Sequence, residues 1–219
     1  MTRVAVVGAH GQVGQRILNQ LYVRGDEGVG IVRNPEHGED LHRLGAESVV
    51  LDIESATADE LAEALRGCDA VVFAAGAGAG SGAERKRTVD YAGSVLTAEA
   101  ARIAGVRRFV QISAIGVDAP LAEDAEPVWA AYVQAKRDAD ERLRATDLDW
   151  TILRPGGLSN DEGTGSVTIG ATVERGPISR EDVAALVLAV LDRPATARRQ
   201  WEVVGGPTPI AEALPAAPA

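Results

Sequence analysis

The sequence contains a single cysteine, Cys68, and only three histidines in 219 residues. One cysteine cannot form an intramolecular disulfide or a multi-cysteine metal site. Cys68 stands just before an apolar run, which favours a small buried side chain over a nucleophile. His10, His37 and His42 lack the spacing typical of metal ligands. We therefore expect no metal centre.

Long apolar runs are also missing. The longest uninterrupted one, at residues 183–191, is far shorter than the roughly 20 residues that a membrane-spanning helix needs. The N-terminus enters an apolar run at once and reaches Gly8 soon afterwards, without the basic segment and long apolar region of a secretory signal. We expect a soluble, cytoplasmic protein with no membrane partner.

Positive charge is scarce. Twenty-two Lys and Arg residues face 32 Asp and Glu residues, which gives a net charge of −10. Such a surface repels phosphate backbones, so nucleic-acid binding is disfavoured. The best basic candidate is "ERKR" at residues 84–87, which is short and begins with an acid. We interpret it as a solvent-exposed helix start rather than a functional patch.

What is present is an ordinary globular composition, with 46% hydrophobic and 25% charged residues. Strands are predicted at residues 3–8, 28–34, 47–53, 69–76, 107–114 and 148–156, and helices at 12–25, 58–67, 84–105, around 130–140 and at 179–193. Strands that are apolar on both faces and alternate with helices indicate a doubly wound, Rossmann-type α/β fold, with helices on both faces of a parallel sheet.

The C-terminal part is less regular. Residues 155–219 are expected to form a small substrate-side region of one domain spanning residues 1–219, because short strands at 167–173 and 199–205 surround only one strong helix. Ser179 can cap that helix. The Pro/Ala-rich tail at 214–219 is expected to fray.

The strongest motif is "GAHGQVG" at residues 8–14, directly after the first strand and before the first helix. Gly8 permits a tight turn, Gly11 lets the backbone approach a pyrophosphate, and Gly14 lets helix and strand pack closely. The helix N-terminus would face the anion. At this position the pattern favours dinucleotide binding over a purely structural turn, with His10, Gln12 and Val13 included in the site.

The end of the second strand indicates which dinucleotide binds. NAD-binding chains usually have an acid there, whereas this strand ends in Arg33, and Asp26 and Glu27 lie at its other end. A guanidinium can bind a 2′-phosphate through two hydrogen bonds. NADP is therefore favoured over NAD; the alternative is that Arg33 is merely exposed.

Tyr132 precedes Lys136 by one helical turn, so the two side chains share a face. Such a pair can carry a proton to or from a substrate oxygen, or it can be one core tyrosine and one solvated lysine. The helix follows the strand that ends in Ser113, in a sheet that opens with a dinucleotide turn. This context favours the pair facing the cofactor crevice.

Together these motifs resemble the short-chain dehydrogenase/reductase superfamily, and more narrowly its atypical, NmrA-like branch of NAD(P)-binding proteins of the epimerase/dehydratase type. The resemblance covers nearly the whole chain. It is carried by "GAHGQVG", "VVLDIES", "VVFAAGAG", "VRRFVQISAIG", "YVQAK", "LDWTILRPGGL" and "ISREDVAALVLAVL", in the family's order.

The resemblance implies further cofactor contacts. Asp52 and Ile53 would meet the adenine, and Lys136 would hold the nicotinamide ribose. Ala74, Ala75 and Gly76 would line the ribose and pyrophosphate. Pro155 and Gly156 would border the nicotinamide.

It also implies a catalytic set. Ser113 would hydrogen-bond the substrate carbonyl, Tyr132 would donate the proton, and Lys136 would lower the pKa of Tyr132. Asp90 stands where other branches place a relay Asn, so it is either part of the relay or a local cap. Tyr91 has Val95 four residues on and so lacks a lysine partner.

The resemblance favours an NADP-dependent oxidoreductase that acts on a small carbonyl, quinone or flavin-like compound. The short region after the sixth strand leaves little room for a nucleotide-sugar. Two alternatives stay open: a redox-sensing regulator that binds NAD(P) without turnover, and an epimerase or dehydratase. The chain is expected to be a monomer or a homodimer.

Overall fold

The computed structural model describes residues 1–78 and 80–215. Ala79, in the glycine-rich stretch after the fourth predicted strand, and residues 216–219, most of the tail predicted to fray, lie outside this part. The strands are β1 Arg3–Val7, β2 Glu27–Val32, β3 Glu47–Val50, β4 Ala70–Phe73, β5 Arg108–Ile112, β6 Asp149–Pro155, β7 Gly157–Ser159, β8 Ser166–Gly170, β9 Pro177–Ser179, β10 Arg199–Gly205 and β11 Thr208–Pro209.

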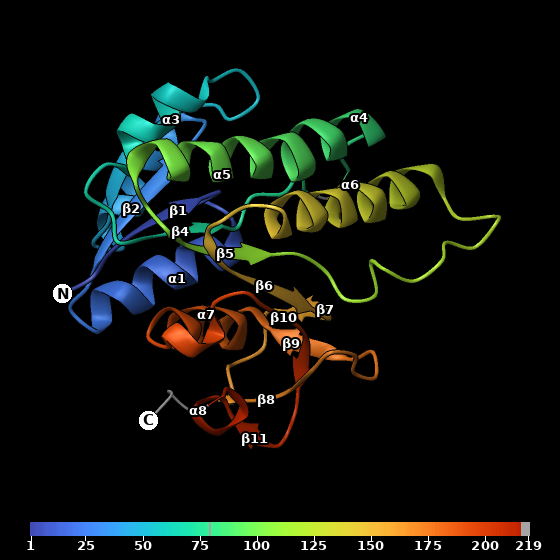
Figure 1. Ribbon diagram of the computed structural model, residues 1–219. Coiled ribbons are helices and arrows are strands. Elements are labelled where there is room, and N and C mark those ends of the chain that lie inside the picture. The colour runs from blue at the N-terminus through green and yellow to red at the C-terminus, as the bar shows by residue number, and fades with distance from the viewer. Residues whose placement is uncertain (79, 216–219) are drawn as a thin grey trace.

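Helices connect these strands on both sides of the sheet (Figure 1). The α-helices are α1 Gln12–Val23, α2 Gly38–Arg43, α3 Ala58–Leu65, α4 Ala83–Arg85, α5 Gly93–Ala104, α6 Pro127–Arg144, α7 Arg180–Leu191 and α8 Ile210–Ala213. The segment η2, Lys86–Ala92, is a π-helix, and η1 Pro35–His37 and η3 Pro194–Thr196 are short 3₁₀ turns.

The main sheet has the strand order β11-β8-β10-β6-β5-β4-β1-β2-β3. Every neighbouring pair in the part β10-β6-β5-β4-β1-β2-β3 is parallel. Strand β1, in the interior of this sheet, shows why the sequence folds this way. Val4 and Val6 join a core cluster with α1 and α7, while Ala5 and Val7 join a second cluster with α3 and α5 on the opposite face. Both faces are buried, which confirms the predicted Rossmann-type fold.

The helix predicted at residues 84–105 is less regular than expected. It runs as α4, the π-helix η2 and α5, and it ends as predicted at Gly105, which has a φ of 75°. π-Helical turns are rare and are often found at functional sites. The helical segment η1–α2 was not predicted, although Asn34 caps it by accepting a hydrogen bond from the Glu36 N–H and Pro35 begins it.

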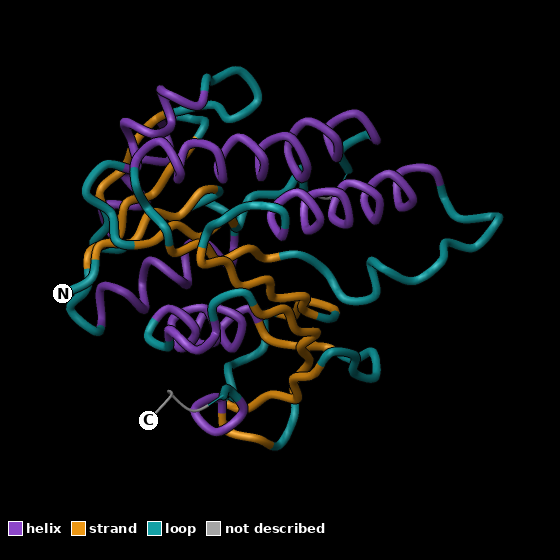
Figure 2. Tube along the Cα trace, in the orientation of Figure 1, coloured by secondary structure: helices purple, strands orange, loops and turns teal. Residues whose placement is uncertain are grey.

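The C-terminal region extends the same sheet. β10 pairs in parallel with β6, and β8 pairs with β10 in antiparallel fashion, while β7 and β9 form a separate two-stranded sheet. A long loop, residues 113–126, leaves β5 and returns at the start of α6 (Figure 2). In the part of the chain that the structure describes, no helix is long and apolar enough to cross a membrane.

Candidate functional site

The glycine turn after β1 leaves no room for side chains. Gly8 has a φ of +83°, and a Cβ atom there would lie 2.5 Å from the Ala75 Cα. At Gly14 a Cβ atom would lie 2.6 Å from the Gly8 carbonyl oxygen. The helix α1 begins at Gln12 with no side-chain cap and no acid in its first turn. Its amide groups and positive dipole end therefore suit an anion such as a pyrophosphate.

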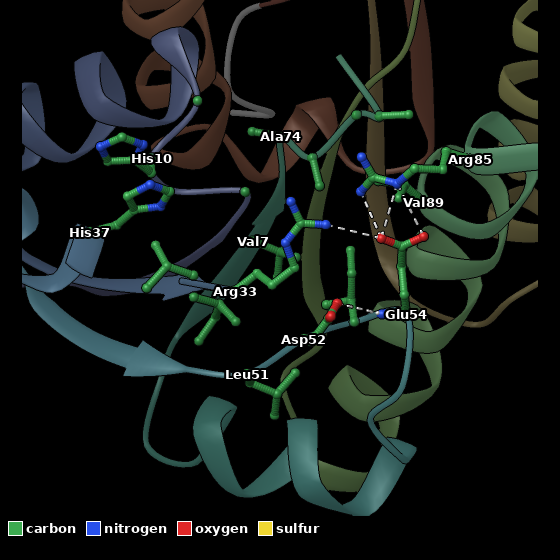
Figure 3. Close-up of a pocket in the computed structure, with 18 residues that line it drawn as sticks. Val7, His10, Arg33, His37, Leu51, Asp52, Glu54, Ala74, Arg85 and Val89 are labelled. Atoms are coloured by element: carbon green, nitrogen blue, oxygen red, sulfur yellow. Dashed lines mark hydrogen bonds and ion pairs between the residues drawn. The ribbon is translucent and has the colours of Figure 1, made fainter. Parts of the chain in front are cut away.

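A cavity of about 350 Å³ opens beside this turn, at the carboxyl ends of β1 to β4 (Figure 3). Its wall includes the backbone of the glycine turn, and two stacked histidines stand at one side. The rings of His10 and His37 are parallel with centroids 3.5 Å apart, and His10 Nε2 lies 3.0 Å from the Asp40 carboxylate. The lining residues are Val7, Gly8, His10, Gly11, Ile31, Val32, Arg33, His37, Leu51, Asp52, Ile53, Glu54, Ala74, Ala75, Gly76, Ala77, Arg85 and Val89.

Three charged side chains meet at the rim of this cavity (Figure 3). Arg33 Nη1 lies 3.3 Å and Arg85 Nη2 lies 2.6 Å from the same oxygen of Glu54, Oε2. Arg85 and the Thr88 hydroxyl hold the pKa of Glu54 below its usual range, so its carboxylate is ionised. Asp52 lies beside it and accepts a hydrogen bond from the Glu54 N–H at 3.0 Å.

A second cavity, of about 560 Å³, shares the wall formed by residues 74–77 with the first. It contains the side chains that were predicted to be catalytic. Its lining is Val13, Ala74, Ala75, Gly76, Ala77, Gly78, Lys86, Asp90, Ile112, Ser113, Glu126, Val128, Trp129, Tyr132, Lys136 and Leu158. A dinucleotide lying along both cavities would pass from the arginines at one end to Tyr132 at the other.

Lys136 is buried, and its ammonium is held by two groups. Nζ lies 3.1 Å from the Asp90 carboxylate and donates to the Ile112 carbonyl oxygen at 3.2 Å. Burial works against the charge, but Asp90, Tyr132 and Asp140 together outweigh it, and the pKa of Lys136 lies above its ordinary value. The other oxygen of Asp90 accepts a hydrogen bond from the Ala77 N–H at 3.0 Å, so this acid ties α6 to the loop after β4.

Tyr132 stands over the second cavity among cationic and aromatic neighbours. The Lys86 ammonium lies 5.4 Å and the Lys136 ammonium 6.0 Å from its ring centroid, and Trp129 packs at 5.5 Å. Burial raises the pKa of Tyr132, and the opposing effect of Lys136 does not overcome it. Lys136 thus lowers the pKa of Tyr132 by its charge, as the resemblance implied, but desolvation is the larger effect and the net pKa lies above the ordinary value.

Ser113 lines the cavity, but its hydroxyl has a partner within the protein. Ser113 Oγ donates to Asp140 Oδ2 at 2.9 Å, and the same buried carboxylate accepts from Gln111 Nε2 at 2.6 Å and from Arg154 Nε at 2.8 Å. Arg154 in turn binds Asp118 with Nη1 and Nη2. This buried network was not predicted from the sequence. The only signals for it were polar residues inside apolar strand and helix patterns.

The remaining predicted residues lie in different places. Gln12 and Gly14 belong to the start of α1 and do not line either cavity. Pro155 and Gly156 are also absent from both linings. Pro155 ends β6, Gly156 follows it, and both are buried beside β10; Leu158 reaches the second cavity instead. The "ERKR" segment is not simply a solvent-exposed helix start, since Arg85 lines the first cavity and Lys86 the second.

Comparisons with known proteins agree with this geometry. Residues 8–194 match a family model described as NAD(P)H-binding. A Bacillus subtilis protein named as the uncharacterised sugar epimerase YhfK is 41% identical, over 97% of this chain and 98% of its own. The structure of a candidate NAD-dependent epimerase/dehydratase from Bacillus halodurans has a TM-score of 0.88 and 38% identity, over 96% and 97% of the two chains. The oxidoreductase ylbE of Lactococcus lactis has a TM-score of 0.84 and 28% identity, over 97% and 94%.

The family match covers most of the chain and begins at the glycine turn itself. The similar structures have the same mostly parallel sheet with surrounding helices, and they include both epimerase/dehydratase and oxidoreductase names. The chain thus belongs to the NAD(P)H-binding family and has a Rossmann-like α/β fold.

Proposed function

We propose that the protein is an NADP-dependent oxidoreductase of the atypical short-chain dehydrogenase/reductase type that reduces a small carbonyl, quinone or flavin-like compound. The observation that carries this proposal is the second cavity. Ser113, Tyr132 and Lys136 line it together, and it shares a wall with the cavity beside the glycine turn. The reduced cofactor, NADPH, would supply the hydride when bound and become NADP; the residues of this chain would bind, orient and protonate.

Tyr132 suits the role of proton donor. Burial keeps the pKa of its hydroxyl above the ordinary value, so the phenol holds its proton at neutral pH. Once the proton leaves for a substrate oxygen, the ammonium of Lys136 stabilises the phenolate by its charge. Asp90 and the Ile112 carbonyl keep that ammonium charged and in place.

Ser113 needs a small rearrangement for its proposed role. Its hydroxyl donates to Asp140, so it must turn away from that carboxylate before it can donate to a substrate carbonyl. Asp140 stays satisfied when this happens, because Gln111 and Arg154 continue to donate to it.

The mouth of the second cavity favours flat, apolar substrates. Trp129 and Leu158 line it and expose 46% and 38% of their surface, although large apolar side chains are usually buried. An aromatic ring of the substrate can stack on Trp129 and leave its carbonyl oxygen near Tyr132. This surface supports quinone-like and flavin-like substrates over small aliphatic carbonyls.

The test is NADPH oxidation with a panel of carbonyls, quinones and flavins, for the wild type, Tyr132→Phe and a matched Tyr91→Phe control. Tyr91 lies under the Arg87 guanidinium and does not line the second cavity. Loss of a general acid typically lowers kcat by about 10²- to 10⁴-fold. We expect that loss for Tyr132→Phe alone. Equal turnover by all three proteins would reject the catalytic role of Tyr132.

The names of the relatives at 41% and 38% identity support a second candidate, an epimerase or dehydratase. In such an enzyme the cofactor is reduced and reoxidised within one cycle, so the protein has no need to release it. Dinucleotide that stays bound through purification, together with no net NADPH consumption on any substrate, would favour this second candidate.

A further inference from the structure

Arg33 and Arg85 converge on one carboxylate at the rim of the first cavity. Arg33 follows β2 and Arg85 ends α4, yet both guanidinium groups contact Glu54 Oε2, at 3.3 and 2.6 Å. The Thr88 hydroxyl donates to the other oxygen, Oε1, at 2.6 Å. Figure 3 shows the two arginines pointing toward Glu54 from two different directions. Three donors from two segments, the end of β2 and the continuous α4–η2 helix, thus surround a single anionic group.

These contacts leave binding capacity unused. The side chains of Arg33 and Arg85 are 57% and 39% exposed, and among the described residues Arg33 makes a single long side-chain contact, of 3.3 Å, with Glu54. Each guanidinium carries five N–H donors in a planar fork that matches phosphate oxygens. A phosphate dianion has three oxygens and more charge than a carboxylate, so it can bind both forks at once.

We propose that Arg85 is a second specificity-determining residue for the 2′-phosphate of NADP, and that Glu54 holds Arg33 and Arg85 at the site until the phosphate displaces it. This inference rests on the proposed use of NADP. Arg85 supplies donors on the side of the phosphate opposite Arg33. Glu54 competes with the phosphate for the two guanidinium groups, because its carboxylate must move away from them before the phosphate can bind.

The neighbouring arginine provides a contrast. Arg87 stands two residues after Arg85, but its Nη1 pairs with Asp138 at 2.6 Å and its guanidinium lies 4.1 Å from the Tyr91 ring centroid. It does not line the first cavity. If positive charge alone attracts the phosphate, removing the charge of either Arg85 or Arg87 should weaken binding. If the phosphate is recognised in the first cavity, only the change at Arg85 should weaken it.

The test uses the adenosine halves of the two cofactors, which need no turnover. Binding of 2′,5′-ADP and of ADP is measured by isothermal titration calorimetry for the wild type, Arg85→Gln, Arg87→Gln, Glu54→Gln and Glu63→Gln. Glu63 is an exposed acid on α3 that pairs with Arg66, away from the first cavity. Thermal unfolding of each variant checks that the fold is retained.

Arg85→Gln should weaken 2′,5′-ADP binding by about 10- to 100-fold, the effect of losing charge-assisted hydrogen bonds, and change ADP binding less than about twofold. Glu54→Gln should tighten 2′,5′-ADP binding several-fold and leave ADP binding little changed, because it removes the competing charge. Arg87→Gln and Glu63→Gln should behave as the wild type.

Other results would overturn the inference. If Arg85→Gln weakens both probes equally, or no more than Arg87→Gln does, Arg85 does not recognise the phosphate. If Glu54→Gln leaves 2′,5′-ADP binding unchanged or weaker, Glu54 is not a competitor. Failure of the proposed function is distinguishable: a wild type that binds 2′,5′-ADP through Arg85 but oxidises no NADPH retains the inference and loses the enzymatic proposal. A wild type that binds neither probe contradicts both.

Discussion

Lys136 and Asp90 form an ion pair of 3.1 Å in which the side chains are only 6% and 1% exposed. Lys136 comes from α6 and Asp90 from the π-helix η2, so the pair joins two helices beside the second cavity. Charges this deeply buried are tolerated only when each has its partner. The pair is therefore required by the fold as well as by the proposed chemistry.

Asp90→Asn tests this dependence. The amide can still accept from the Ala77 N–H, but Lys136 loses its counter-charge, so its pKa should fall and the free energy of unfolding should drop by about 3–5 kcal/mol. Urea unfolding at pH 7 measures the loss. The matched control is Asp138→Asn, whose partner Arg87 is 58% exposed, and a loss of no more than about 1 kcal/mol is expected there. Equal losses would mean that burial does not govern the strength of the Lys136–Asp90 pair.

The glycine turn allows a second matched comparison. Gly8 and Gly25 have nearly the same φ, +83° and +81°, but a Cβ atom at Gly8 would meet the Ala75 backbone at 2.5 Å and one at Gly25 would meet nothing within 4 Å. Gly25→Ala should lower the free energy of unfolding by about 1–2 kcal/mol, because alanine is strained in the left-handed backbone conformation. Gly8→Ala should cost about 1–3 kcal/mol more, from steric overlap.

Urea unfolding measures both losses, and calorimetry with ADP measures binding. Gly8→Ala should also abolish ADP binding, because the backbone near the predicted pyrophosphate position must move, whereas Gly25→Ala should bind normally. Normal ADP binding by Gly8→Ala would contradict the assignment of this turn to the dinucleotide.

Local patterns were sufficient to predict the sheet and this turn. Val4 to Val7 alternate between two buried faces, and Gly8 follows them directly, so the strand, its burial and the tight turn are all encoded within a few consecutive residues. The same holds for Gly105, whose left-handed conformation ends α5. Each of these features depends on neighbours in the sequence.

The predictions that failed depend on contacts between distant segments. Arg85 was interpreted as a solvent-exposed residue because its partner, Glu54, belongs to a different connection, after β3. Arg154 and Asp140 are buried together, yet each looks like an ordinary charged residue in its own strand or helix. Helix packing and chain geometry decide which polar side chains meet at the edge of a sheet. A single sequence carries no direct signal of these meetings between distant segments.

Arg154 and Asp118 provide a test by pH. Arg154 donates to both oxygens of Asp118 and holds the pKa of this carboxyl below its usual value. A lowered folded-state pKa means that the pair contributes stability above the unfolded pKa of about 4, and that this contribution is lost as the pH falls through the lower folded value.

Asp118→Asn should therefore lower the free energy of unfolding by about 0.5–1 kcal/mol at pH 7, a modest effect because the Asp118 side chain is 56% exposed. The difference from the wild type should shrink as the pH is lowered below about 4, where the wild-type carboxyl also becomes protonated. Urea unfolding of both proteins between pH 7 and pH 3 measures this difference in the free energy of unfolding. A difference that stays constant over this range would show that the charge of Asp118 is irrelevant.

Trp129 provides a test of the substrate class. It is 46% exposed at the mouth of the second cavity and packs on the Tyr132 ring at a centroid distance of 5.5 Å. If flat aromatic substrates stack on it, Trp129→Ala should raise KM for quinones about 3- to 10-fold, the effect of losing one aromatic contact. The kcat for quinones should stay within about threefold of the wild-type value, because Tyr132 can still transfer the proton. For small aliphatic carbonyls, which cannot stack, KM should hardly change.

A matched control for Trp129→Ala is Ile103→Ala, which removes a similarly exposed apolar side chain, 42% exposed, from α5, outside both cavities. Both variants should unfold at nearly the wild-type urea concentration, because neither side chain belongs to the buried core. Since stability is matched, a rise in KM that is specific to Trp129→Ala and to aromatic substrates can only come from the cavity mouth. An equal rise for aliphatic and aromatic substrates would mean that Trp129 shapes the entrance without recognising a flat ring.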